Sequence, residues 1–107
     1  MTNKQQKEYY QAYKQKVMDS LDMSEDIFNM FRLNGLKLNK IYTDYCNGDI
    51  TEKEEDKLEY PIYTKLKSVC QLLGYFIYYQ TDPRGATIYL DTKPIPDNNY
   101  NSAYCIY

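Results

Sequence analysis

The stretch QTDPRGATIYL, residues 80–90, decides the fold of this chain. Pro83 fixes φ at the first corner of a turn, and Asp82 can accept a hydrogen bond from the backbone ahead of it. Gly85 suits a left-handed backbone conformation that other residues resist. The stretch therefore predicts a tight reversal between two strands, with Arg84 at its tip.

Extended segments are expected on both sides of this turn. Residues 75–79 (YFIYY) and 86–90 (ATIYL) are rich in aromatic and β-branched residues, which favour strands. Residues 93–99 form a rigid, polar excursion, and residues 103–107 (AYCIY) then provide a third strand at the sheet edge. Because an isolated two-stranded ribbon is marginal in water, helices must cover one face of this sheet.

The first predicted helix spans residues 3–23, which contain neither Gly nor Pro. Its apolar residues recur at three- and four-residue steps and make one stripe: Tyr10, Tyr13, Val17 and Leu21. Lysines, Lys14 among them, and glutamines fill the remaining faces. The segment is therefore predicted to be an amphipathic helix with a lysine-rich outer surface.

A second helix is predicted to begin at Ser24, whose side chain can cap the free N–H groups. Its first half, residues 27–33, is dense enough in apolar residues to indicate near-complete burial. Asn34-Gly35 is predicted to stop or sharply kink this helix, and the helical stripe resumes until Asn47-Gly48.

A capping box, Thr51 with Glu54, predicts the start of the next helix. Pro61 lacks an N–H and its ring clashes with the preceding turn, so we expect a short acidic helix to about Glu59. A further helix then begins near Pro61 and ends at Gly74.

Together these segments predict an α+β fold in a single domain, residues 1–107. Three to four helices in residues 1–74 pack on a small antiparallel sheet of two to three strands in residues 75–107. The length of 107 residues allows a core large enough to fold alone, with no room for a second domain.

Composition argues against several functional classes. The net charge of −2 disfavours a general binder of duplex DNA, which usually needs a strongly basic face. The chain has no histidine, so the usual acid/base at neutral pH and the commonest metal ligand are missing. Cys46, Cys70 and Cys105 are far apart and form no CxxC, which predicts free thiols in a reducing cytoplasm. We therefore expect neither an enzyme nor a cofactor.

No segment of the chain approaches the ~20 apolar residues needed to cross a bilayer, and residues 1–7 lack the apolar run of a signal peptide. A partial calcium-loop pattern begins at Asn47-Gly48 and ends at Glu54. Its register would require Thr43 and Tyr45 as ligands, so a helix stop followed by a capping box is the favoured interpretation.

Two sets of residues are candidates for contact with a partner. The first is the tip residue Arg84 with the neighbouring Tyr78, Tyr79 and Tyr89, because Tyr and Arg bring area and directional hydrogen bonds to protein interfaces. The second is an acidic helix surface that could meet a basic partner: Glu54, Glu55 and Asp56. For the second set taken alone, a solvated helix face is the favoured interpretation.

Gly74-Tyr75 followed by residues 80–90 resembles a segment that recurs in short phage and prophage proteins of unknown role. Those proteins carry a DPRG turn followed by small and apolar residues ending in YL, and the resemblance covers roughly the last third of the chain. It implies a viral accessory origin. Many small acidic phage proteins inhibit host machinery, including CRISPR nucleases and other defence systems.

The function expected from these observations is binding to a host or phage protein, with inhibition of a host defence system as the role. The alternative is a module that binds single-stranded nucleic acid or nucleotides, in which lysines of the first helix act with exposed tyrosines. Exposed sheet edges and abundant aromatic residues also allow a homodimer.

Overall fold

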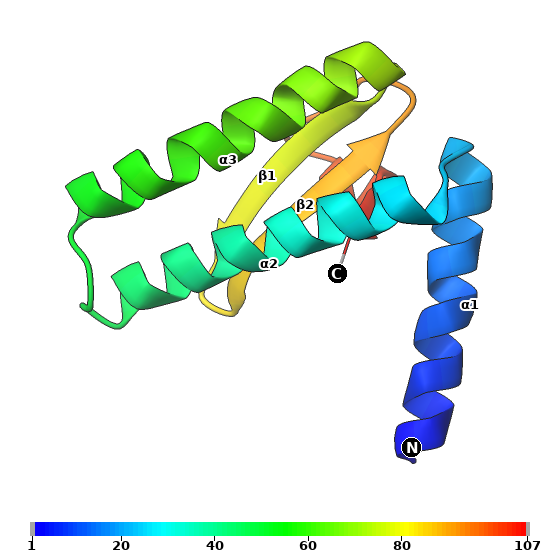
Figure 1. Ribbon diagram of the computed structural model, residues 1–107, viewed down its shortest axis with the longest axis horizontal. Helices are drawn as coiled ribbons and strands as arrows, with labels where there is room; N and C mark the ends of the chain where they lie inside the picture. The colour runs from blue at the N-terminus through cyan, green and yellow to red at the C-terminus, as the bar shows by residue number, and fades with distance from the viewer. Residues whose placement is uncertain (1, 107) are drawn as a thin grey trace. The chain divides into compact units, whose positions relative to one another are not determined.

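The computed structural model describes residues 2–106 and confirms the α+β fold. Within this range the helices α1 (Asn3–Leu21), α2 (Glu25–Cys46) and α3 (Glu52–Leu73) precede the strands β1 (Phe76–Asp82), β2 (Gly85–Asp91) and β3 (Tyr104–Ile106). A short 3-10 helix, η1 (Tyr100–Ser102), precedes β3 (Figure 1). The chain divides into two compact units, Met1–Met30 and Phe31–Tyr107. No helix in residues 2–106 combines the length and apolar character needed to cross a membrane.

Helix α1 follows the predicted pattern and begins with a capping box. The Thr2 side chain accepts the Gln5 N–H at 3.2 Å, and the Gln5 side chain accepts the Thr2 N–H at 2.8 Å. Val17 and Leu21 of the apolar stripe are buried. The helix ends two residues earlier than predicted, because Asp22 adopts a left-handed conformation with φ of 52°.

Lys14 departs from the prediction that the lysines of α1 lie on its outer surface. The residue is buried, its Nζ lies 3.3 Å from a carboxylate oxygen of Glu25, and it sits 5.5 Å from the ring centre of Phe28. A long side chain can bury its methylene stem while its charge meets a carboxylate and an aromatic ring. The prediction that Lys14 is exposed, which rested on its being a lysine, is therefore wrong.

Helix α2 does not stop at Asn34-Gly35, so the predicted break there is wrong. Gly35 lies inside the helix and is buried, and an added Cβ would come within 3.5 Å of Ile88. A glycine costs a helix only about 1 kcal/mol. The buried Phe31 and Leu38 on either side anchor the helix strongly enough to offset that cost.

Helix α3 is also continuous, so the predicted division at Pro61 is wrong as well. Pro61 lies within α3 on the exposed side. The capping box at Thr51 and the glycine cap at Gly74, where φ is 79°, bound the helix as predicted. The buried Leu66 lies beyond the proline and Glu55 before it, so tertiary packing holds both halves in one helix despite the lost backbone hydrogen bond.

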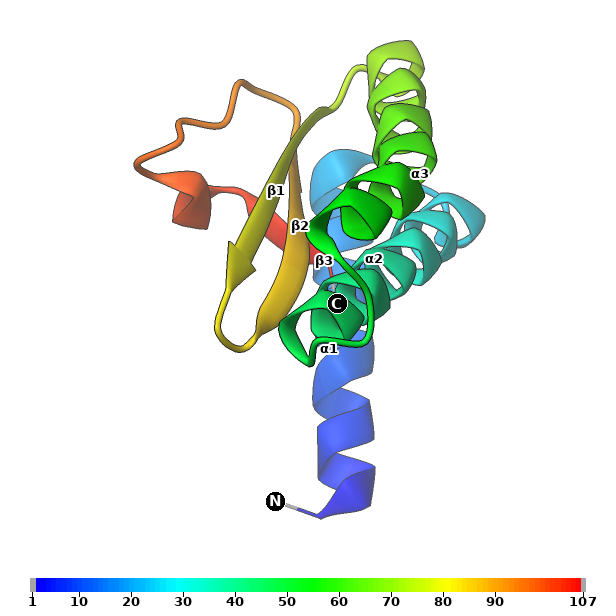
Figure 2. The same cartoon turned by 90° about the vertical axis from the view of Figure 1, so that its left-hand side faces the viewer.

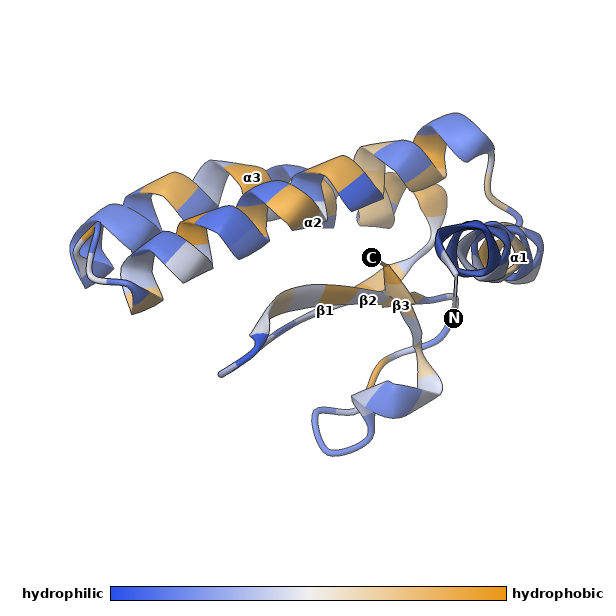
Figure 3. Ribbon diagram, turned by 90° about the horizontal axis from the view of Figure 1, so that it is seen from below, coloured by the Kyte–Doolittle hydropathy of each residue, from blue (hydrophilic) through white to orange (hydrophobic). Residues whose placement is uncertain are grey.

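The sheet has the order β1-β2-β3 with antiparallel pairing throughout, and Tyr78 lies opposite Tyr89. Its inner face carries Ile88 and Leu90, which are fully buried, and α3 and residues 31–46 of α2 lie over this face of the sheet (Figure 2). The connector from β2 to β3, with η1, lies on the opposite, outer face (Figure 3). The predicted strand at residues 103–107 is confirmed over Tyr104–Ile106, whereas Tyr107 lies outside the described residues.

Candidate binding site at the hairpin tip

The turn between β1 and β2 is held as the sequence predicted. Pro83 and Arg84 are its central residues. Both have a negative φ, because among residues 2–106 the positive-φ residue other than glycine is Asp22. Among the common turn types, type I is the one with a negative φ at both central positions. A carboxylate oxygen of Asp82 accepts the Arg84 N–H at 2.7 Å, and this bond is the main reason that the pKa of Asp82 is lowered.

Gly85 and Asn39 lock the turn against α2. Gly85 has φ of 148°, a value that L side chains rarely adopt, and a Cβ there would lie 2.5 Å from Oδ1 of Asn39. The same Oδ1 accepts the Ala86 N–H at 2.9 Å. Asn39 was not among the predicted site residues, because a lone amide on a helix gives no signal of a contact 47 residues away.

Arg84 is presented to solvent at the tip of this locked hairpin. Its side chain is 92% exposed, and its Nη2 lies 3.4 Å from a carboxylate oxygen of Asp82. An exposed pair at this distance is worth little in free energy, so Asp82 orients the guanidinium without neutralising its hydrogen-bonding capacity. Arg84 therefore keeps most of its donors for a partner.

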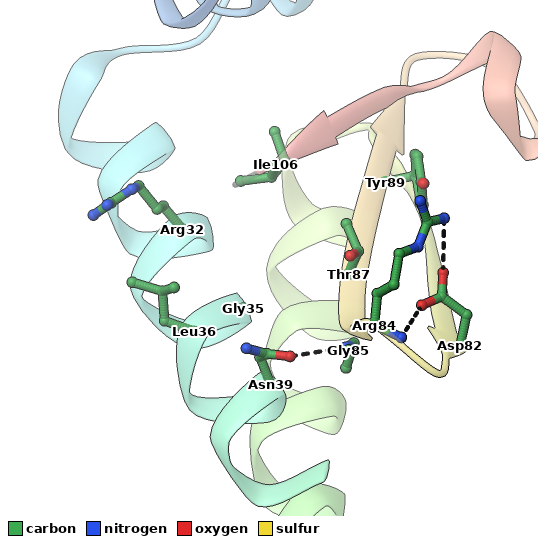
Figure 4. Close-up of a pocket in the computed structure, with 11 residues that line it drawn as sticks. Arg32, Gly35, Leu36, Asn39, Asp82, Arg84, Gly85, Thr87, Tyr89 and Ile106 are labelled. Atoms are coloured by element: carbon green, nitrogen blue, oxygen red, sulfur yellow. Dashed lines mark hydrogen bonds and ion pairs between the residues drawn. The ribbon is translucent and has the colours of Figure 1, made fainter. Parts of the chain in front are cut away.

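A groove of about 290 Å³ runs beside Arg84, between α2 and β2. Its lining includes Gly35, Leu36, Asn39, Thr87, Tyr89 and Ile106. Figure 4 shows Arg84 alongside β2, with its guanidinium near Tyr89 and Asp82, whereas Arg32 points away from the hairpin. Arg32 and Arg84 both border the groove, but their guanidinium groups do not converge on one point.

A smaller hollow of about 130 Å³ lies on the other side of the turn. It is lined by Pro83, Arg84 and Gly85 together with the C-terminal end of α2. Arg84 thus borders both hollows, and a partner that covers the hairpin tip would contact it from either side.

Two of the candidate tyrosines, Tyr78 and Tyr89, lie together on the outer face of the sheet. The ring of Tyr100 from η1 stacks on Tyr78 at 5.1 Å with an interplanar angle of 9°, and its centre lies 5.0 Å from the Tyr89 ring. Burial raises the pKa of Tyr89. Tyr89 also lines the groove beside Arg84. Through its contact with Tyr100, it links this groove to η1 in the segment that joins β2 to β3.

Tyr79 is separated from the other two tyrosines. It lies on the inner face, where its hydroxyl donates to Glu59 of α3 at 2.7 Å and its ring lies 5.6 Å from that of Tyr63. Burial and the hydrogen bond to Glu59 raise its pKa. The two-residue period of a strand already places Tyr78 and Tyr79 on opposite faces, and this signal could have separated them in the sequence.

The acidic candidates on α3 differ from one another in environment. A carboxylate oxygen of Glu54 accepts the Thr51 N–H at 3.0 Å, so this side chain serves as a helix cap. Glu55 is only 8% exposed, and Asp56 is exposed. Both approach Glu59, and the three carboxylates have oxygen atoms within 4.8 Å of one another. None of the acidic candidates lines the groove beside Arg84.

The three cysteines form no disulfide and lie in contrasting environments. Cys46 is exposed at the end of α2. Burial raises the pKa of Cys70 and of Cys105 to about 11. A thiol with such a pKa is almost wholly protonated at neutral pH and is a poor nucleophile.

Comparison of the chain with protein-family models, with curated proteins and with solved structures gives no match.

Proposed function

We propose that this chain is a small binding protein that acts by docking its hairpin tip on another protein. The observation that carries the proposal is Arg84, whose exposed guanidinium stands on a turn fixed by Asp82 and by the contact of Asn39 with Ala86. A turn whose backbone is fixed in advance loses little conformational entropy on binding, and arginine is enriched at the energetic centres of interfaces. The partner surface would offer a carboxylate or backbone carbonyl groups to it.

A binding role rather than an enzymatic one is supported by the side chains present. The chain lacks histidine, and the buried thiols of Cys70 and Cys105 have raised pKa values. Beside Arg84, the carboxylate of Asp82 is engaged by the Arg84 N–H, and the pKa of Tyr89 is raised by burial.

The resemblance of residues 80–90 to short phage proteins extends this proposal to a biological role. In that role the protein acts in the host cytoplasm as an inhibitor of a defence system, such as a CRISPR nuclease. The nucleic-acid alternative gains no support from the outer-face tyrosines, because Tyr78 and Tyr89 pack against Tyr100 and do not offer an open stacking platform.

The proposal is tested by capture of partners from a lysate of the natural host. The wild-type chain should retain one protein, and Arg84→Glu should reduce its recovery at least tenfold while the Tm stays unchanged. Lys93→Glu, which reverses another exposed cation, is the matched control and should bind normally. An Arg84→Glu protein that captures as well as wild type would contradict the proposal.

The anti-defence role needs a separate measurement. Expression of the chain in cells with an active CRISPR nuclease should restore plasmid transformation, and Arg84→Glu should abolish that rescue. If transformation stays low across the defence systems of the host while partner capture persists, the binding proposal stands and the inhibitory role fails.

A further inference from the structure

The outer edge of β1 presents a row of backbone groups directed away from the sheet. The Ala86 N–H points away from β1, since it donates to Asn39. Ala86 lies opposite Thr81, so this is a non-hydrogen-bonded pair, and the N–H and C=O of Thr81 also point away from β2. The alternation of the ladder gives Tyr79 and Ile77 the same orientation. Within residues 2–106 no strand lies beyond β1 on this side.

The β1 strand itself lacks the features that commonly protect an edge against pairing with another chain. Natural edge strands are commonly short, bulged, or interrupted by lysine or proline. Strand β1, with the sequence FIYYQTD, contains neither residue and pairs with β2 in one unbroken register from Phe76 to Asp82. Such a strand is a template for the addition of an extended segment.

Helix α3 places negative charge beside this edge. In Figure 1, β1 lies between α3 and β2. The hydrogen bond from the Tyr79 hydroxyl to Glu59 sets this carboxylate level with the middle of the strand. Glu55 and Asp56 have carboxylate oxygens within 4.8 Å of that of Glu59, and in the described part of the chain none of the three forms an ion pair.

Glu55 shows that this charge is uncompensated. The residue is 8% exposed and takes part in none of the ion pairs between the described residues. Its pKa is raised by burial and by repulsion from Glu59, Asp56 and Glu52. A cation placed among these groups would favour the charged carboxylate and so oppose both effects on the pKa.

We propose that the β1 edge and the cluster Glu55, Asp56 and Glu59 form a docking site for an extended, basic segment of a partner protein. The segment pairs with the free backbone groups of Ile77, Tyr79 and Thr81. Directly opposed residues in an antiparallel pair point to the same face, so the residue opposite Tyr79 faces α3. A lysine or arginine at that position reaches the three carboxylates. This site goes beyond the proposed function, since it is separate from Arg84.

The test is an NMR titration of the full chain with two heptapeptides, TVTKTVT and TVTETVT, capped at both ends. The lysine peptide should shift the amide signals of Ile77, Tyr79 and Thr81 and slow their hydrogen exchange, with at least tenfold tighter binding than the glutamate peptide. Equal affinity for the two peptides, or the absence of shifts at these amides with millimolar lysine peptide, would overturn the proposal.

Two variants separate the contribution of the β1 edge to peptide binding from that of the acidic cluster. Thr81→Pro blocks the edge without removing a bond to β2, and it should abolish binding in a protein that still melts cooperatively. If Thr81→Pro unfolds the chain, the double variant Glu55→Gln with Asp56→Asn decides instead, because it should remove the preference for lysine. Asp97→Asn, on the connector, is the control for lost negative charge and should bind as wild type.

Further outcomes separate this site from its alternatives. Arg84→Glu should leave binding of the lysine peptide unchanged, even where it abolishes capture of the host protein. Protection of the Ile77, Tyr79 and Thr81 amides that grows with protein concentration alone would identify a second copy of the chain as the occupant, and would overturn the assignment to a basic segment.

Discussion

The two faces of the sheet carry different kinds of side chain and differ in how deeply these side chains are buried. The inner face carries Ile88 and Leu90, which are fully buried under the helices. The outer face carries Tyr78 and Tyr89, which remain partly exposed and are covered by the single ring of Tyr100. Aliphatic burial thus fixes the fold on one side, whereas the other side keeps polar hydroxyl groups near solvent. The stability of the domain should therefore depend on the inner face far more than on the outer one.

The largest expected effect comes from a cavity on the inner face. Leu90→Ala should lower the free energy of unfolding by about 2–5 kcal/mol, because the removed methyl groups leave a space that the packed helices cannot fill. Gln80→Ala, on the outer face, is the matched change and should cost less than about 1 kcal/mol. Urea denaturation measures both. Equal losses would show that the contrast between the faces is wrong.

A smaller loss in the free energy of unfolding is expected from a change in the turn between β1 and β2, which sets which residues of each strand lie on each face. Gly85→Val should cost on the order of 1–3 kcal/mol, since a β-branched residue must adopt φ of 148° and its Cβ meets Asn39. In an Asn39→Ala background the steric part disappears and the backbone strain stays. A double-mutant cycle by urea denaturation separates the two contributions. A Gly85→Val loss near zero would contradict the assigned turn.

The outer face should respond weakly to removal of its cover. Tyr100→Ala deletes the stack on Tyr78 and the contact with Tyr89, and aromatic pairs contribute roughly 0.5–1.5 kcal/mol beyond burial. We expect a loss in this range by urea denaturation. A loss as large as that of Leu90→Ala would place Tyr100 in the core and would remove the distinction between the faces.

The smallest effect is a difference in thiol reactivity. At pH 8 iodoacetamide should modify Cys46 first, because it is exposed, whereas the raised pKa values of Cys70 and Cys105 keep these thiols protonated. Cys105 lies opposite Tyr89 on the outer face. Tyr100→Ala should therefore accelerate labelling of Cys105 several-fold and leave Cys70 unchanged, as measured by mass spectrometry. Acceleration of both thiols would indicate general loosening instead.

Local chemistry was enough to predict the turn and both ends of α3. Asp82, Pro83 and Gly85 act through neighbouring backbone, and the capping box at Thr51 involves a residue three positions away. Each signal is complete within a few residues. The sequence therefore predicted the reversal, the exposed Arg84 and the glycine cap at Gly74.

Features that depend on tertiary contacts were not predictable in this way. The helices continue through Gly35 and Pro61 because buried residues on both sides pack against the rest of the fold. Local helix propensity cannot predict such packing. The role of Asn39 depends on a strand far along the sequence. The acidic residues at Glu54, Glu55 and Asp56 look alike in the sequence, and only the fold makes one a cap and buries another.

The connector at residues 92–103 has a consequence for the order of assembly. Strands β1 and β2 are joined by a two-residue turn, whereas β3 reaches its place only after this long connector closes. The hairpin should form early, and Tyr104–Ile106 should join last and detach first. Each detachment uncovers the backbone of β2 from Ile88 to Leu90, so docking of Tyr104–Ile106 covers a sheet edge that could otherwise pair with another chain.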